Sequence, residues 1–441
     1  MTLWHIISIV WSVFGILWVV QHAENPHSAW AWILLMFICP PLCTLILILI
    51  GNQTPKPRNH NQNIYNNRLS NLIFNESNSR LTLHNRVKTL HDAAATYSEI
   101  LRALHHAKRS IHVAYYIISD DAIGKTLLDI LARKASAGVE VALIYDALGS
   151  WRLSKQRIKE LSARKIQVRS YSPLSLRTIG SLNRRNHRKL LIIDHNTLFL
   201  GGINIATRYL HPTHSSHWRD EHIRIDGDAA RQAEELFAAD WQACGGSSLS
   251  APKIHSRTST HCPIQLVWSS TEQPYAIHRT YSELIASAKH SVIIATPYFT
   301  PAEELVESLI KAARSGVKVE IILPARSDIR LIDYASQHYI ERCSGFGVDF
   351  YLYRHGFMHS KLIIVDSMCV GVGSANFDYR SMRYNAEIMA LIFNRQVVRS
   401  YVQTVRHDMA ACQPLTPFEQ RKKSAKEQLL SSLARLLSPL L

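Results

Sequence analysis

NHRKLLIID (residues 186–194) and MHSKLIIVD (residues 358–366) both read H-x-K-x-x-x-x-D. A glycine-containing turn that ends in asparagine follows each motif at the same distance, GGIN at 201–204 and GSAN at 373–376. The two copies are in register, because 359 − 187 and 376 − 204 both equal 172. One such motif occurs by chance in many proteins, whereas two copies in register indicate two halves of one active site.

The sequence around the motifs predicts a duplicated α/β domain. A repeat of this length is too long for a solenoid unit, and the 441-residue chain has room for two or three domains. Each half has a strand-like, a helix-like and a second strand-like segment: 110–118, 122–137 and 139–145 in the first half, and 291–299, 301–315 and 317–323 in the second. This alternation predicts a parallel or mixed sheet with helices on both faces. The His and Lys of each motif, two residues apart, would project from one face of a strand.

The N-terminal region predicts a membrane anchor. Residues 3–20 and 29–50 are apolar runs, each close to the length that crosses a hydrocarbon core of about 30 Å. The short polar segment between them contains Pro26, so we expect a transmembrane hairpin over residues 1–51. The first Lys or Arg is Lys56, just after the second run. The positive-inside rule then places the catalytic body in the cytoplasm, on a multi-pass protein.

Composition sets the remaining boundaries. Residues 52–80 are rich in asparagine and are expected to be a juxtamembrane linker. The two repeats are expected at 81–250 and 258–412, separated by a segment rich in Gly and Ser. The tail, 413–441, carries basic residues and then leucines at helical spacing. It is predicted to be either an interfacial membrane helix or a helix packed on the body.

Charge and cysteine usage narrow the class of partner. Lys and Arg outnumber Asp and Glu by 50 to 34, which gives a formal net charge of +16. This surplus favours a phosphate-bearing partner, either a nucleic acid or an anionic membrane, although a soluble basic protein would have the same composition. The seven cysteines contain no C-x-x-C and indicate neither a disulfide framework nor a zinc site.

The repeated motif predicts phosphodiester chemistry without a cofactor. Two lysines can neutralise the phosphoryl oxygens in the transition state, and asparagine and serine add neutral donors. One histidine can attack phosphorus while the other protonates the leaving alkoxide and later deprotonates the acceptor. A carboxylate behind each imidazole would fix its tautomer. Asp194 and Asp366 are candidates for this role, but a purely structural role is equally compatible with their positions.

These motifs resemble the phospholipase D superfamily, and the wider sequence is similar to the bacterial cardiolipin synthases. The similar stretches are 183–189, 201–205, 218–222 and 237–241 in the first half, and 296–299, 373–381 and 385–387 in the second. The resemblance implies two pseudo-symmetric phospholipase D-like α/β/α sandwich domains after a two-helix transmembrane hairpin. The two N-terminal apolar runs resemble that family's anchor as well.

The resemblance also implies a reaction and a set of site residues. A phosphatidyl group would pass from one phosphatidylglycerol to another through a phosphohistidine, giving cardiolipin and glycerol. The implied catalytic residues are His187, Lys189, Asp194, His359, Lys361 and Asp366, with Asn204, Ser374 and Asn376 binding substrate and Asp220 and Glu387 as supporting groups. We expect His187 to be the nucleophile and His359 the general acid, although the pseudo-symmetry does not decide the order.

The expected partners are phosphatidylglycerol and anionic membrane lipids at the bacterial inner membrane, with no nucleic acid, metal or other cofactor. A nuclease would use the same double motif and suit the charge, but a membrane anchor favours a lipid substrate. A hydrolytic phospholipase D or another phosphatidyltransferase would differ only in the acceptor. A non-catalytic scaffold would show a damaged motif, and both motifs are intact. The oligomeric state is left open by the sequence.

Overall fold

The computed structural model describes residues 3–22, 32–37, 39–44, 68–173, 183–211, 217–250, 258–270, 272–415, 425–436 and 438. Its centre is a 15-stranded mixed sheet. The first repeat contributes β1 (Thr82–Leu90), β2 (Ser110–Tyr115), β3 (Glu140–Asp146), β4 (Gln167–Tyr171), β5 (Lys189–Ile193), β6 (Thr197–Gly201) and β8 (His222–Gly227). The second repeat contributes β9 (His261–Trp268), β10 (Ser291–Ala295), β12 (Lys318–Pro324), β13 (Val348–Tyr353), β15 (Leu362–Val365), β16 (Cys369–Gly373), β18 (Ile388–Ile392) and β19 (Cys412–Pro414).

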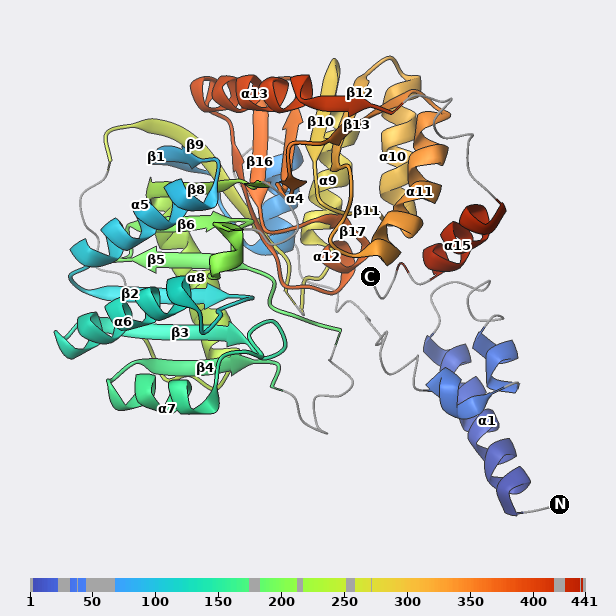
Figure 1. Cartoon of the computed structure of the whole chain (residues 1–441), viewed down its shortest axis with the longest axis horizontal. Helices are drawn as coiled ribbons and strands as arrows, with labels where there is room; N and C mark the ends of the chain where they lie inside the picture. The colour runs from blue at the N-terminus through green and yellow to red at the C-terminus, as the bar shows by residue number, and fades with distance from the viewer. Residues whose placement is uncertain are drawn as a thin grey trace.

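The strand order displays the duplication. From its outer edge inward, the first half runs β4-β3-β2-β5-β6-β8-β1, and the second half runs β13-β12-β10-β15-β16-β18-β9, with β19 added at the far edge. The halves join where β1 pairs antiparallel with β9. Strands β4, β3 and β2 are parallel to one another in the first half, as are β13, β12 and β10 in the second. The strands that contain or follow the H-x-K motifs, β5 and β15, are antiparallel to their neighbours. The predicted mixed sheet is confirmed, and Figure 1 shows the strands of the two halves running in different directions.

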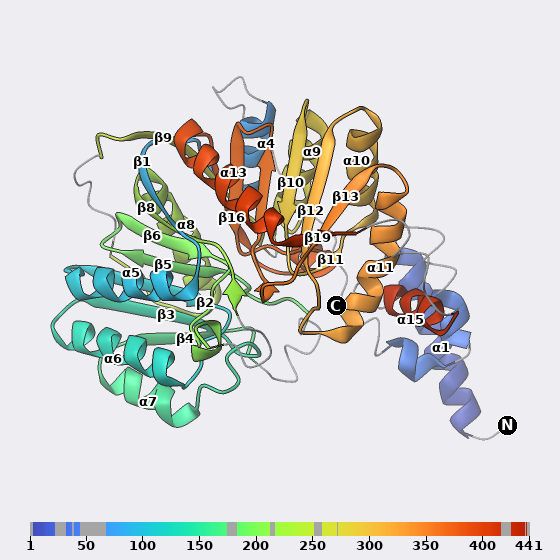
Figure 2. The same cartoon turned by 45° about the horizontal axis from the view of Figure 1, so that its top comes forward.

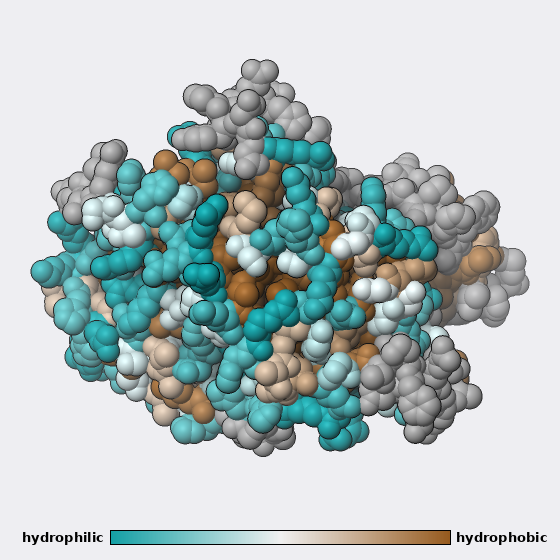
Figure 3. Space-filling model, turned by 90° about the horizontal axis from the view of Figure 1, so that it is seen from above, coloured by the Kyte–Doolittle hydropathy of each residue, from teal (hydrophilic) through white to brown (hydrophobic). Residues whose placement is uncertain are grey.

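Helices cover both faces of each half. They are α5 (Ala93–His106), α6 (Ala122–Ser136), α7 (Lys155–Ala163), α8 (Asp228–Ala243), α9 (Ala276–Ser287), α10 (Glu303–Arg314), α11 (Arg330–Ser344), α12 (Tyr379–Arg383) and α13 (Arg395–Ala410). Helices α5 and α6 pack on one core and α9 and α10 on a second, whereas α8 and α13 share a central core with apolar residues from both halves (Figure 2). Seen from above, the described surface is mostly hydrophilic, and hydrophobic residues show in a hollow near its middle (Figure 3).

The structure corrects the predicted linker boundary. Arg68–Ser77 form a helix, α4, that packs on α9 of the second half. The side chain of Ile73 is fully buried there, and the hydroxyl of Ser77 donates to the carbonyl of Trp268 at 2.9 Å. The buried face of this helix is formed by Ser70, Ile73 and Ser77. The rest of the predicted linker, up to residue 67, lies outside the described residues.

The two ends of the chain add further helices. Helix α1 (Leu3–His22) covers the first apolar run, and residues 29–31, 38 and 45–50 of the second run lie outside the described residues. Among the residues that the structure describes, no helix combines the length and the hydropathy needed to span a bilayer. In the tail, residues 412–414 form β19 on the edge of the sheet, so the second domain extends slightly beyond residue 412. Helix α15 (Ala425–Leu436) packs on α11, the second of the two placements expected for the tail.

Candidate active site

The two motif histidines meet at one cavity between the halves. The cavity has a volume of about 300 Å³, and both His187 and His359 line it. Each imidazole is largely buried, with 14% and 10% of its surface exposed, respectively. The structure therefore brings the two copies of the motif together, as the repeat predicts, and leaves only a small part of each ring open to a ligand.

A carboxylate from the opposite half holds each imidazole. His187 Nδ1 lies 2.8 Å from Glu387 Oε1, and His359 Nδ1 lies 2.6 Å from Asp220 Oδ2. Both carboxylates are fully buried. An ionised carboxylate only accepts hydrogen bonds, so each Nδ1 carries the proton, and the lone pair of Nε2 is left for chemistry.

Backbone hydrogen bonds between the halves hold each histidine next to the carboxylate of the opposite half. The His187 N–H donates to the carbonyl of Ala386, the residue before Glu387, at 2.9 Å. The His359 N–H donates to the carbonyl of Arg219, the residue before Asp220, at 2.7 Å. Strand β14 (Phe357–Met358) also pairs with β7 (Trp218–Arg219). Each histidine thus reaches its carboxylate because its own backbone is bonded across the interface next to that carboxylate.

The electrostatics of these pairs favour ionised carboxylates and neutral rings. Burial would raise the pKa of Asp220, but Lys361 and His359 hold it below its ordinary value. The pKa of Glu387 is lowered in the same way, against burial, by His187 and Lys189. Burial lowers the pKa of His359 to about 4 and also lowers that of His187. In the absence of an anion, both rings are neutral at pH 7.

The two lysines are buried beside the histidines. Lys189 Nζ donates to the carbonyl of His187 at 2.6 Å, and Lys361 Nζ donates to the carbonyl of His359 at 2.5 Å. Burial lowers the pKa of Lys189 to about 7 and that of Lys361 to about 8. A phosphodiester anion in the cavity would oppose this effect, since it favours the charged ammonium groups.

The three predicted substrate-binding residues occupy different positions. Asn204 and Asn376 line the cavity, one from each half. Ser374 instead donates from its hydroxyl to Glu387 Oε2 at 2.5 Å. Its counterpart 172 residues earlier is Gly202, where an added Cβ would lie 2.0 Å from Asp220 Oδ1. The same position therefore supports the carboxylate in one half and makes room for it in the other.

We expect Ser374→Ala to slow phosphatidyl transfer about tenfold, because Glu387 loses one hydrogen bond to a buried charge while the His187 contact remains. Steady-state kinetics would show the loss mainly in kcat. Wild-type kinetics in this variant would mean that the serine does not help to position Glu387.

Asp194 and Asp366 lie at the far ends of their strands from the cavity. The Asp194 carboxylate accepts from the backbone N–H groups of residues 108, 109 and 110 at 2.7–3.1 Å. Asp366 accepts from residues 289, 290 and 291 at 2.7–2.9 Å. Both have a positive φ, 52° and 51°. Of the two roles that the sequence allowed, these contacts match the structural one, because each aspartate ties its turn to the start of a neighbouring strand.

We expect Asp366→Ala to destabilise the protein by about 2–3 kcal/mol, because three N–H acceptors disappear and alanine tolerates the positive φ poorly. The backbone N–H groups hold the pKa of Asp366 below its ordinary value against the effect of burial. A lowered pKa means that this contribution is present above the ordinary pKa of 3.8 and is lost as the pH falls below it. Thermal unfolding should show a lower Tm at pH 7, with kcat per folded molecule near wild type. A wild-type Tm with abolished turnover would instead support a catalytic role.

Aromatic residues complete the cavity, and little in the sequence indicates them. Tyr116 contacts the His187 ring edge to face at 4.9 Å, and Trp218 lies 4.8 Å from the His359 ring. Tyr116 directly follows β2 and lines the cavity. The other lining residues that the motifs did not single out include Arg208, Tyr209, Tyr298, Asp328 and Arg380. Arg208 and Tyr209 lie on a short 3₁₀ helix (Thr207–Tyr209) and Arg380 lies on α12. All five residues lie outside the repeated motifs, so the 172-residue register does not identify them.

Comparison with known proteins agrees with this geometry. A family model described as cardiolipin synthase, phospholipase D-like domain, matches residues 100–241 and 281–409. A cardiolipin synthase of Clostridium perfringens (strain SM101 / Type A) is 33% identical over 455 residues, which cover 95% of each chain. The cardiolipin synthase of Halalkalibacterium halodurans is 35% identical over 83% of this chain and 74% of its own length.

Among solved structures, the phosphatidylserine synthase of Haemophilus influenzae Rd KW20 superposes with a TM-score of 0.62. The match covers 85% of this chain and 98% of that one at 16% identity, so it shows the fold alone. The family model covers more than half of the sequence, and the relatives match over most of their length. The chain therefore belongs to the cardiolipin synthase family of phospholipase D-like enzymes.

Proposed function

We propose that this enzyme transfers a phosphatidyl group from one phosphatidylglycerol to a second, giving cardiolipin and glycerol through a phosphohistidine. The proposal rests mainly on one observation. Two imidazoles, one from each half of the chain, line a single cavity, and a buried carboxylate holds each of them. The identity of the lipids rests on the family to which the chain belongs.

In the first step, His187 Nε2 attacks phosphorus and the P–N bond forms as the bond to the glycerol oxygen breaks. His359, which is neutral in the free protein, takes up a proton on Nε2 from solvent when the phosphodiester anion binds. It gives this proton to the glycerol oxygen, so glycerol leaves as a neutral alcohol. In the second step, His359 takes the proton from the acceptor hydroxyl, whose oxygen attacks phosphorus. The P–N bond then breaks, and His187 is regenerated.

The buried lysines support both steps. Lys189 and Lys361 come from opposite halves, and each ammonium group is bonded to the carbonyl of a histidine that lines the cavity. From there the two positive charges would balance the phosphoryl oxygens as charge develops on them. Glu387 stabilises the positive ring that His187 carries as a phosphohistidine, and Asp220 does the same for protonated His359. The lysines thus balance the negative charge on the phosphoryl oxygens, and the carboxylates balance the positive charge on the two rings.

We also propose that the N-terminal region anchors the catalytic body on the cytoplasmic side of the bacterial inner membrane. The support is the pair of apolar runs before residue 51 and the absence of Lys and Arg before Lys56. An anchored site would meet lipids by their diffusion in the plane of the bilayer.

The test supplies the purified full-length protein with vesicles of phosphatidylglycerol alone. Cardiolipin and free glycerol should appear in equal amounts. Phosphatidic acid as the main product would indicate hydrolysis, and cleavage of DNA without lipid turnover would contradict a lipid substrate. His355→Ala is a matched control, because this exposed histidine lies four residues before His359 and does not line the cavity.

A further inference from the structure

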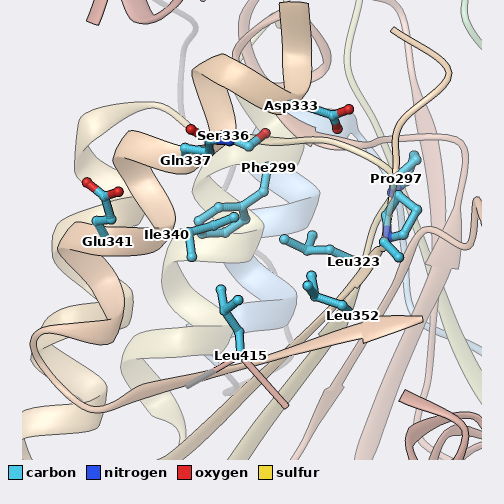
Figure 4. A pocket seen from close by; sticks show the side chains of 12 residues that line it. Pro297, Phe299, Leu323, Asp333, Ser336, Gln337, Ile340, Glu341, Leu352 and Leu415 are labelled. Carbon is cyan, nitrogen blue, oxygen red and sulfur yellow. The ribbon is translucent and has the colours of Figure 1, made fainter. Parts of the chain in front are cut away.

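A second cavity lies beside the catalytic one, in the second half of the chain. Its volume is about 280 Å³, and apolar side chains from strands and helix α11 make up most of its lining. In Figure 4, Phe299, Leu323, Ile340, Leu352 and Leu415 face one another across its middle. The catalytic mechanism uses none of these residues.

The two cavities share their dividing wall. Along one extended segment, Tyr298 lines the catalytic cavity, whereas its neighbours Pro297 and Phe299 line the second one. Neighbouring residues at the start of α11 also line different cavities, since Ile332 lines the catalytic cavity and Asp333 lines the second one. The two cavities are therefore direct neighbours, separated by the side chains of these shared segments.

The second cavity has a polar end and an apolar end. Asp333, Ser336 and Gln337 lie at one side of it, Glu341 lies next to Ile340, and the aliphatic side chains Leu352 and Leu415 lie at the other side (Figure 4). The polar end is formed by the part of α11 that adjoins the catalytic cavity. The hydroxyl of Ser336 and the amide of Gln337 are groups that can donate to an ester carbonyl. A ligand with an ester group followed by a hydrocarbon chain would match the polar end and the apolar end of this cavity.

The helix that walls the second cavity also supports an apolar outer surface. Helix α15 packs on α11, where the Ser431 hydroxyl donates to the carbonyl of Tyr334 at 2.8 Å. On α15, Leu429 and Leu433 are 61% and 51% exposed, and Leu331 of α11 is 38% exposed. Exposed leucines on α15 and at the start of α11 indicate that this side of the second half meets an apolar environment such as a lipid surface.

We propose that the second cavity binds one acyl chain of the phosphatidylglycerol whose phosphate occupies the catalytic site. The inference rests on the proposed function and adds to it a chain-binding site, lined by Phe299, Ile340, Leu352 and Leu415. The bound chain fixes the diacylglycerol part of the donor, and the phosphate is thereby presented to the two histidines.

Variants that fill the cavity test the proposal. Leu415→Trp and Ile340→Trp should raise KM for dioleoyl phosphatidylglycerol at least tenfold and leave KM for dihexanoyl phosphatidylglycerol within about twofold of wild type, since short chains fill little of the cavity. Met368→Trp is the matched control, because it enlarges a residue that is 66% exposed, lies in the turn between β15 and β16 and lines neither cavity. Equal effects on both lipids, or none on either, would overturn the chain-binding site. Absence of cardiolipin from either lipid with the wild-type protein would instead contradict the proposed function.

A second measurement does not depend on the folding of a variant. Wild-type protein is irradiated with phosphatidylglycerol that carries a diazirine near the end of one acyl chain, and the labelled peptides are identified. Label on α11, β12 or β13 at the lining residues is expected, and excess unlabelled phosphatidylglycerol should compete it away. Label confined to the exposed leucines of α15 would overturn the proposal in favour of surface contact alone.

Discussion

Replacing either His187 or His359 with alanine is expected to lower the rate of cardiolipin formation by on the order of 10⁴-fold, because one removes the nucleophile and the other the proton donor. Both rings line one cavity, and each is held by a buried carboxylate, so neither half is arranged to react alone. The measurement is initial-rate formation of cardiolipin from phosphatidylglycerol vesicles. His355→Ala should retain wild-type activity.

A substrate with an activated leaving group separates the two roles. A p-nitrophenyl ester of phosphatidic acid releases p-nitrophenolate, which needs no proton to leave. His359→Ala should therefore still give one equivalent of p-nitrophenol and retain the phosphatidyl group on His187. His187→Ala should give neither. The reverse pattern would exchange the roles of the two histidines, and activity near wild type in either variant would contradict the shared site.

The sequence alone identifies the chemistry because the groups that perform it are repeated in register. The 172-residue offset relates His187 to His359 and Lys189 to Lys361, and the alternation of strands and helices predicts the mixed sheet around them. The comparisons confirm the family that these motifs indicated. The local periodicity is strong in these segments, and the helices and strands form where it predicts them.

The 172-residue offset does not identify the carboxylates that hold the two histidines. Asp220 and Glu387 occupy equivalent positions in the two halves. Asp220 lies two residues before His222, which pairs with Gly201. Glu387 lies two residues before Met389, which pairs with Gly373. However, 387 − 220 equals 167, so the loops differ in length and the repeat offset misses the pair. Each carboxylate also serves the histidine of the opposite half, a relation that only the packing of the two domains creates. Tyr116 and Trp218 were hidden for the same reason, as their contacts depend on loop placement.

Neutralising the carboxylates is expected to slow phosphatidyl transfer by on the order of 10³-fold in both Asp220→Asn and Glu387→Gln. The amide keeps the shape of the carboxyl group, but it no longer stabilises a positive ring or enforces the protonated Nδ1. Substitution of an exposed carboxylate, Glu303→Gln on α10, should leave the rate unchanged. Far-ultraviolet circular dichroism and Tm would verify that each variant is folded.

The two variants should differ in how their loss depends on pH. Burial lowers the pKa of His359 and Asp220 raises it, so Asp220→Asn should lower that pKa further. The protonated ring donates to the leaving glycerol, and the rate falls as pH rises above its pKa. A bound phosphodiester anion favours the protonated ring, so the falling limb in kcat reports a pKa above the value of about 4 in the free protein. In Asp220→Asn this limb moves to lower pH, and the loss of activity is greater at pH 8 than at pH 6.

Glu387→Gln acts on a ring that must be neutral to attack. Glu387 raises the pKa of His187 against the effect of burial, so its removal lowers that pKa and leaves the ring neutral at every pH between 6 and 8. The loss in this variant should therefore be constant over that interval. Profiles of kcat against pH for both variants would establish the assignment, because a pH-dependent loss in Glu387→Gln together with a constant loss in Asp220→Asn would mean that His187 is the acid and His359 the nucleophile.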